Sequence, residues 1–170
     1  AENELFCSMT PLSAKAISQR EREELATRFF AYVNLNETPE GRFPGYRDRP
    51  KKFLYDYLKA ANDTAENDPG LVDQLRNEFI RILEFVLRTF PLGFRKSETA
   101  KTIPRVRFEA IAVGSALALR DQPNLVVNQA VVVQRMNDAG FNSVVVSDGA
   151  NVRSKLEGRI DLVKRILLEE

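Results

Sequence analysis

The sequence contains no histidine and no tryptophan, and it has a single cysteine, Cys7. Without histidine, the chain can build neither a Ser-His-Asp nor a Cys-His catalytic arrangement, nor the general base of an HNH nuclease, nor a zinc site that uses imidazole. One thiol can form neither an internal disulfide nor a cysteine-rich zinc site. We therefore expect a reducing compartment, the cytoplasm, and not a secreted scaffold.

Long apolar runs are also missing. No run approaches the roughly 20 residues that a membrane-spanning helix needs, and residues 1–12 lack the basic-then-apolar order of a signal peptide. We expect no membrane association. The sequence begins with Ala and not with Met, which we interpret as the mark of a processed or excised piece of a longer protein.

The chain has 170 residues, of which 44% are hydrophobic, and this predicts one folded domain over residues 1–170. Its 25 basic and 24 acidic residues leave a net charge of +1. A protein that binds nucleic acid over its whole surface usually has a large positive excess. Any contact with nucleic acid must therefore come from locally concentrated charge.

Helical spacing of apolar residues dominates the chain. It predicts helices over residues 18–33, 51–61, 71–90 and 105–120, and a last one that carries Leu156, Ile160, Val163 and Leu167. Ser18 and Glu21 have the spacing of a capping box, which would start the first of these helices at Ser18. The sequence NDTAENDPG is expected to end the 51–61 helix.

The helix at about residues 105–120 is apolar on nearly every face, which is typical of a central helix surrounded by others. Gly114, with Ala110 and Ala118, would let a neighbouring helix approach closely. Residues 129–147 fit either a helix or a strand, and one short strand near 143–147 remains open. The predicted fold class is all-α or mainly α, a compact multi-helix bundle around this central helix.

The sharpest local feature is the charge of residues 95–107. Arg95, Lys96, Lys101, Arg105 and Arg107 oppose only Glu98, so this window carries +4. Ser97, Thr99 and Thr102 can donate hydrogen bonds to phosphate oxygens, and the amides at the start of the following helix attract anions. These five basic residues are our candidates for contacts with a nucleic-acid backbone, and a solvated loop is the plainer alternative.

Two further basic sites are weaker candidates. Arg153 and Lys155 lie in the first turns of the last helix, where positive charge opposes the helix dipole and a bound anion would compensate. A second cluster spans the end of the irregular segment 34–50 and the start of the next helix, at Arg42, Arg47, Arg49, Lys51 and Lys52. Its aromatic residues Phe43 and Tyr46 suit base stacking, but we favour both rings packing on the core.

Arg28 lies among core-facing residues, so we expect it to pair with a carboxylate, and Glu24 is four residues away. Arg105 and Glu109 have the same spacing and the same structural interpretation. The sequence has no phosphate-cradling glycine motif, no calcium loop and no cluster of cysteine or histidine. We therefore name no catalytic residue, no metal ligand and no cofactor.

Four segments, taken in order, resemble a known family. They are REELATRFFAYV, FLYDYLKAAN, FPLGFRKSETAKTIPRVRFEAIAVGSALAL and SDGANVRSKLEGRIDLVKRIL. Over roughly residues 12–170 they are similar to the C-terminal helical half of GmrSD-type ParB-like proteins, a group long described as a domain of unknown function. The stretch FRKSETAKTIPRVRFEAIAVG is the most specific part of the resemblance.

The resemblance implies a bacterial protein that acts in defence against foreign or modified DNA. In this family an N-terminal ParB-like half carries an acidic-Gly-Gln-Gln-Arg motif, associated with nucleotide hydrolysis and DNA cleavage. No DGQQR stands in this sequence, and without histidine it contains no HNH module. The catalytic half is absent from this chain, so the implied catalytic residues have no positions here.

Our first hypothesis is a helical accessory domain that supports a ParB-like half or partner subunit, contacts DNA and performs no catalysis alone. The alternative is a purely structural or oligomerisation module, including a homo-oligomer, without nucleic-acid contact. A third interpretation is a piece of an α/β enzyme, in which residues 143–147 form a strand and the next helix start holds a phosphate. A parallel strand beside 143–147 would favour that third interpretation.

Overall fold

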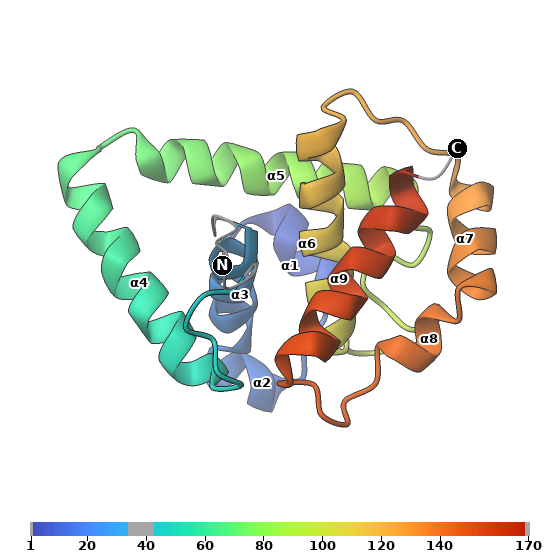
Figure 1. Ribbon diagram of the computed structural model, residues 1–170, viewed down its shortest axis with the longest axis horizontal. Coiled ribbons are helices and arrows are strands. Elements are labelled where there is room, and N and C mark those ends of the chain that lie inside the picture. Colours follow the sequence, from blue (N-terminus) through green and yellow to red (C-terminus); the bar gives the residue numbers. More distant parts are fainter. Residues whose placement is uncertain (1, 34–42, 169–170) are drawn as a thin grey trace.

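The computed structural model describes residues 2–33 and 43–168, and within them the chain forms nine helices and no strand (Figure 1). The predicted all-α fold is confirmed. The helices are α1 (Glu4–Met9), α2 (Ala14–Ser18), α3 (Glu21–Val33), α4 (Pro50–Asn67), α5 (Leu71–Thr89), α6 (Arg105–Asp121), α7 (Gln129–Asp138), α8 (Phe141–Val144) and α9 (Arg153–Leu168). No helix in these ranges is both long and apolar enough to cross a membrane.

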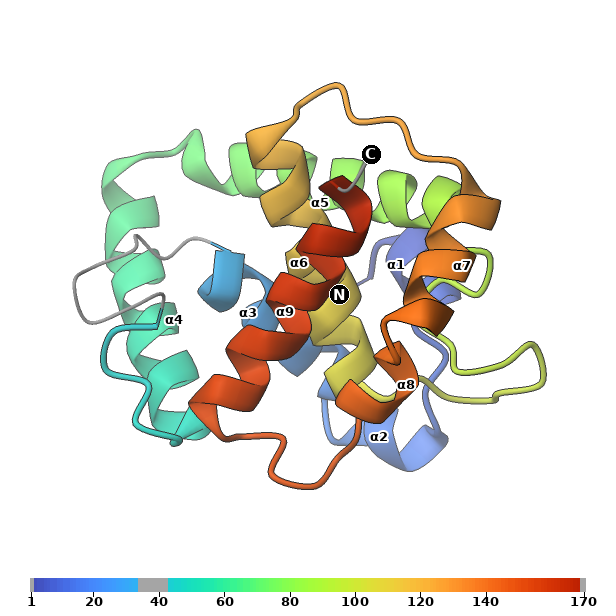
Figure 2. The ribbon, with the colours of Figure 1, turned by 45° about the vertical axis from the view of Figure 1, so that its right-hand side comes forward.

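Helix α6 is the centre of the domain, as its lack of a polar face predicts. Thirteen of its 17 residues are buried. Helix α9 crosses α6 on one side, and this crossing is seen in both views (Figures 1 and 2). Helices α3 and α5 also pack against α6. The central helix therefore joins elements from the beginning, the middle and the end of the chain.

The crossing of α6 and α9 depends on Gly114. A Cβ atom at this position would lie 2.7 Å from Val163 Cβ and 2.9 Å from the carbonyl oxygen of Ile160. Only a residue without a side chain allows the two backbones to come this close. The prediction that Gly114 admits a neighbouring helix is confirmed.

Helix α4 continues past the predicted break and ends at Asn67. Two side chains of its polar end bond to the turn before them: Thr64 Oγ1 donates to the carbonyl of Ala60 at 2.9 Å, and Asn67 Nδ2 donates to that of Asp63 at 2.8 Å. No Pro or Gly interrupts the helix before Pro69. Helices α4 and α5 meet at an angle on one side of the molecule (Figure 1).

Other predictions need correction. Residues 129–138 form helix α7, and 141–144 form the short helix α8, followed by irregular backbone through 147. Of the two structures left open for this segment, the helix is found and the strand near 143–147 is not, which removes the α/β enzyme interpretation. Ser18 ends α2 and does not cap α3, because Arg20 adopts a positive φ of 60° that separates the two helices.

The segment 34–50 was predicted to be a loop, and its first part, 34–42, lies outside the described residues together with Arg42. After it, Phe43 and Tyr46 are fully buried and pack against Tyr32 and Phe53. The preferred interpretation, that both rings belong to the core, is confirmed. Neither ring is available to stack on a nucleic-acid base.

Candidate functional site

The connection between α5 and α6, residues 90–104, carries three of the predicted phosphate contacts and is held at both ends; we call it the basic connection. Near its start, the buried ring of Phe94 packs edge-on against Phe108 with ring centres 4.8 Å apart. Near its end, Ile103 is buried and its amide donates to the carbonyl of Pro11 at 3.2 Å. The cations between these anchors are therefore presented on a fixed backbone.

The three cations of the basic connection, Arg95, Lys96 and Lys101, have no carboxylate partner among the described residues. Lys96 and Lys101 are exposed and Arg95 is half-buried. None of the three has an acidic oxygen within 4.0 Å in the described ranges of the chain. The hydroxyls of Ser97 and Thr99, 3.3 Å apart, lie between them in the sequence and are also exposed. This surface offers positive charge and hydrogen-bond donors together.

Three other candidates are bound within the protein. Arg105 lies 3.7 Å from Glu109 and donates to Asn151 at 3.3 Å. Arg153 pairs with Glu157 at 2.9 Å, one turn later in α9. Lys155 donates to the backbone oxygen of Asp148 at 3.1 Å and lies 3.9 Å from its carboxylate. The dipole cost of the two cations on α9 is therefore offset by carboxylates of the chain itself.

Arg107, the remaining candidate, is buried at 6% exposure. Its Nη1 donates to Asn142 Oδ1 at 3.3 Å, and its guanidinium carbon lies 4.9 Å from the ring centre of Phe141. Burial lowers the pKa of Arg107. The structure thus places Arg107 behind the basic connection, against α8, and not on the outer surface with Lys96 and Lys101.

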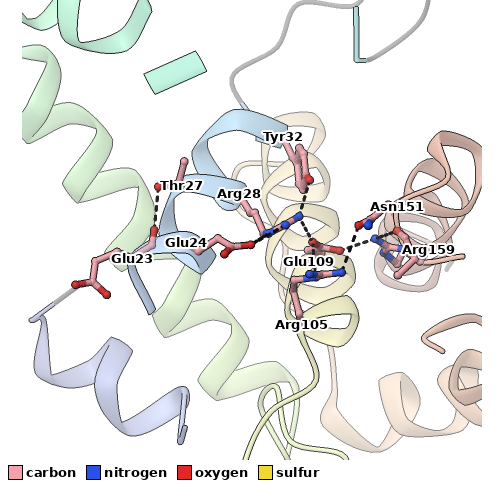
Figure 3. Close-up of polar contacts among 10 residues, drawn as sticks. Glu23, Glu24, Thr27, Arg28, Tyr32, Arg105, Glu109, Asn151 and Arg159 are labelled. Atoms are coloured by element: carbon pink, nitrogen blue, oxygen red, sulfur yellow. Dashed lines mark hydrogen bonds and ion pairs between the residues drawn. The ribbon is translucent and has the colours of Figure 1, made fainter. Parts of the chain in front are cut away.

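A buried ionic network joins α3, α6 and α9 beside this region, and we call it the Glu109 cluster (Figure 3). It consists of Glu24, Arg28, Arg105, Glu109 and Arg159. Glu109 Oε1 accepts from Arg28 at 3.0 Å, and Glu109 Oε2 accepts from Arg159, which also donates to the carbonyl of Ala150 at 2.9 Å. Arg28 further pairs with Glu24 at 2.7 Å, as the sequence predicts.

Each arginine of the cluster lies beside a carboxylate. Burial opposes the charge of Arg28, but the carboxylates of Glu109 and Glu24 outweigh it and raise the pKa of Arg28. Burial, with Glu109 nearby, also raises the pKa of the Tyr32 hydroxyl, which accepts from Arg28 at 3.0 Å. Both groups therefore hold their protons at neutral pH. The arrangement fastens α3, α6 and α9 to one another.

Glu109 is the residue that sequence reasoning undervalued. Its pairing with Arg105 was predicted from their spacing, but its contacts with Arg28 and Arg159 span 81 and 50 positions. One signal was available: Glu109 is the only acidic residue between Arg107 and Leu119 in an otherwise apolar helix. A carboxylate in such a place must have buried partners.

No metal site emerges among the described residues. In the described part of the chain, no group of three or more Cys, Asp or Glu side chains could hold a metal ion.

Comparison with known proteins gave no match: neither a family model, nor a curated protein, nor a solved structure is matched by this chain.

Proposed function

We propose that this chain is a helical accessory domain of a GmrSD-type ParB-like protein, and that it contacts DNA phosphates through the basic connection. The order of the four similar segments supports the family, and the family brings with it a role in cytoplasmic defence against foreign DNA. We assign catalysis to the ParB-like half or partner subunit and not to this chain. Its catalytic motif, DGQQR, has no counterpart in these 170 residues.

One observation carries the DNA-contacting role. Arg95, Lys96 and Lys101 lack carboxylate partners among the described residues, whereas Arg105, Arg153 and Lys155 have them. Phosphate contacts need cations whose charge the protein has not already neutralised. The anchors Phe94 and Ile103 fix the backbone that presents them. Such contacts give affinity for the backbone without preference for a base sequence.

The test is the salt dependence of binding to a labelled DNA duplex, measured by fluorescence anisotropy. Three phosphate contacts predict a slope of about −2.7 in a plot of log affinity against log salt concentration. The triple variant Arg95→Gln, Lys96→Gln, Lys101→Gln should flatten this slope. A control with equal loss of charge at exposed positions on α4 and α5 should keep it: Lys59→Gln, Arg76→Gln, Arg81→Gln.

Two results would contradict the proposal. One is equal slopes for the two triple variants, which would mean that net charge alone drives binding. The other is no binding by the wild type even at low salt.

A structural or oligomerisation module is the second candidate, and a separate observation favours it. A cavity of about 690 Å³ opens between α4 and α5, with Phe53, Tyr57, Leu71 and Leu75 among its walls. Apolar walls of this kind are typical of surfaces that a partner covers. Light scattering coupled to size exclusion distinguishes the candidates. A stable oligomer that ignores DNA favours this one, and a monomer that binds DNA favours the first.

A further inference from the structure

A second cavity lies behind the basic connection and shares only Lys96 with the proposed phosphate contacts. It measures about 540 Å³, within the range of about 300–1,000 Å³ usual for small-molecule sites. The basic connection, the start of α6, and helices α7 and α8 surround it, and Figure 2 shows these elements on one side of the molecule. Its apolar wall comes from Phe90, Leu92, Val133, Met136 and Phe141.

The cavity contains a buried cation that the protein does not neutralise. Arg107 lines it and is 6% exposed, and its side chain makes one hydrogen bond within the described residues, the 3.3 Å contact with Asn142. Its Nε has no hydrogen-bond partner, and no carboxylate of the described residues lies within 4.0 Å of its guanidinium. The other two buried arginines, Arg28 and Arg159, both pair with Glu109.

An unpaired buried charge is costly, and its persistence needs a compensating partner. The ring of Phe141 at 4.9 Å supplies part of that compensation, since a guanidinium over an aromatic face is favourable. An anion would supply the rest. Buried arginines elsewhere in this fold take carboxylate oxygens, and a guanidinium offers two parallel N–H donors that match a carboxylate.

The charges that line the cavity set the charge of the ligand. Arg107 and Lys96 contribute +2 and Glu98 contributes −1, so the lining carries +1. A monoanion neutralises this lining, whereas a dianion leaves a negative excess beside Glu98. The apolar walls require a ligand whose body is apolar.

We propose that this cavity binds a small organic monocarboxylate with an apolar or aromatic body, its carboxylate held by Arg107 at the base and Lys96 at the rim. Ser97, Asn137 and Asn142 also line the cavity and provide further polar contacts. The apolar body lies against Met136 and Phe90. Because the ligand neutralises a buried charge, it stabilises the fold as it binds.

The experiment uses phenylacetate as the probe and its uncharged analogue phenylacetamide as the matched control. Calorimetric titration and thermal unfolding of the full chain should show binding and a rise in Tm with phenylacetate only. Phenyl phosphate, a dianion near pH 8, should bind more weakly than phenylacetate. Equal binding of phenylacetamide would overturn the role of charge, and tighter binding of phenyl phosphate would overturn the monocarboxylate assignment.

Variants locate the site. Arg107→Met should lower phenylacetate affinity at least tenfold, and Lys96→Gln should lower it a few-fold, whereas Arg76→Gln on the exposed surface of α5 should not change it. If Arg107→Met does not fold, nuclear magnetic resonance of the arginine Nε–H groups in the wild type replaces it. The Arg107 signal should then shift with phenylacetate while that of Arg76 stays fixed. An unmoved Arg107 signal, or no binding by the wild type, overturns the proposal.

Discussion

At Glu109, one carboxylate holds two buried guanidinium groups, those of Arg28 and Arg159, which come from opposite parts of the chain. Each of these side chains is at most 3% exposed. Taking such charges out of water is expensive, so each depends on the presence of the others. The half-exposed Glu24 adds a second acceptor for Arg28 at the edge of the cluster. Removing any one of these charges therefore leaves another one buried with fewer ion-pair partners.

Glu109→Gln should therefore lower the free energy of unfolding by about 3–5 kcal/mol, because Arg159 loses its carboxylate partner and Arg28 keeps only the half-exposed Glu24. Urea denaturation measures this. The control is Asp73→Asn, which breaks the exposed pair with Arg76 and should cost less than about 1 kcal/mol. The triple variant Arg28→Met, Glu109→Gln, Arg159→Met should recover much of the loss. A loss below 1 kcal/mol in Glu109→Gln would contradict the cluster's role.

Residue spacing predicted only the local half of this cluster. Glu24 with Arg28, and Arg105 with Glu109, are four positions apart and face each other on any helix. Arg159 gave no such signal, since its only carboxylate partner lies on a different helix. The same limit applies to the candidate site. The charge of residues 95–107 and the spacing of Arg105 and Glu109 are visible in the sequence, but only the fold shows that Arg107 is buried and that Lys96 and Lys101 are exposed.

At the crossing of α6 and α9, the backbones of the two helices come close together in the core. The contact is made by a glycine on one helix and by Val163 and Ile160 on the other. Because the atoms that meet Gly114 include backbone, a side chain there can be accommodated only if the helices separate. Helix α9 also has its own glycine, Gly158, which faces open space.

These two glycines make a matched pair. Gly114→Ala should destabilise the protein by about 1–3 kcal/mol through overpacking. Gly158→Ala should stabilise it by about 0.4–1 kcal/mol, because alanine restricts the unfolded chain and suits a helix. Thermal unfolding of the two variants measures both signs. If Gly114→Ala were as stable as the wild type, the close approach of the two helices would be disproved.

Three long helices, α5, α6 and α9, were predictable from the sequence, whereas the short helices and the second half of α4 were not. Helices α5, α6 and α9 have apolar spacing over 16 or more residues, so the signal is repeated several times within each. Helix α8 has four residues, fewer than two turns, and the valine run 144–146 at its end resembles a strand. The polar end of α4 looked like a break because Asn, Asp and Thr compete with backbone hydrogen bonds. In α4, Thr64 and Asn67 instead bond back to carbonyls of the helix itself.

Across the whole molecule, burial is uneven. Helix α6 is covered on nearly all sides, whereas α4 buries only Phe53 and Leu54 of its 18 residues. Helix α4 packs against α3, α5 and the rings of Phe43 and Tyr46, and it lies at the edge of the domain (Figure 2). Elements with few buried contacts open more readily than the core, so the two helices should differ in local stability.

Hydrogen exchange monitored by mass spectrometry measures that difference. Backbone amides of residues 61–67, at the exposed end of α4, should exchange at least about 100-fold faster than those of residues 110–118 in α6. The amides of α5, which borders both, should be intermediate. Equal protection of the ends of α4 and α6 would mean that the domain opens only as one cooperative unit.

The position of α9 over α6 also bears on how the protein is made. A ribosome makes a chain from its N-terminus to its C-terminus, so α6 emerges before α9. The residues of α9 that cover α6 include Ile160 and Val163. Until α9 has emerged, the apolar side of α6 that α9 covers is exposed to solvent, and chaperones bind exposed apolar surface of this kind. The core around α6 is therefore closed only once α9 has emerged, after the contacts of α6 with α3 and α5 can already form.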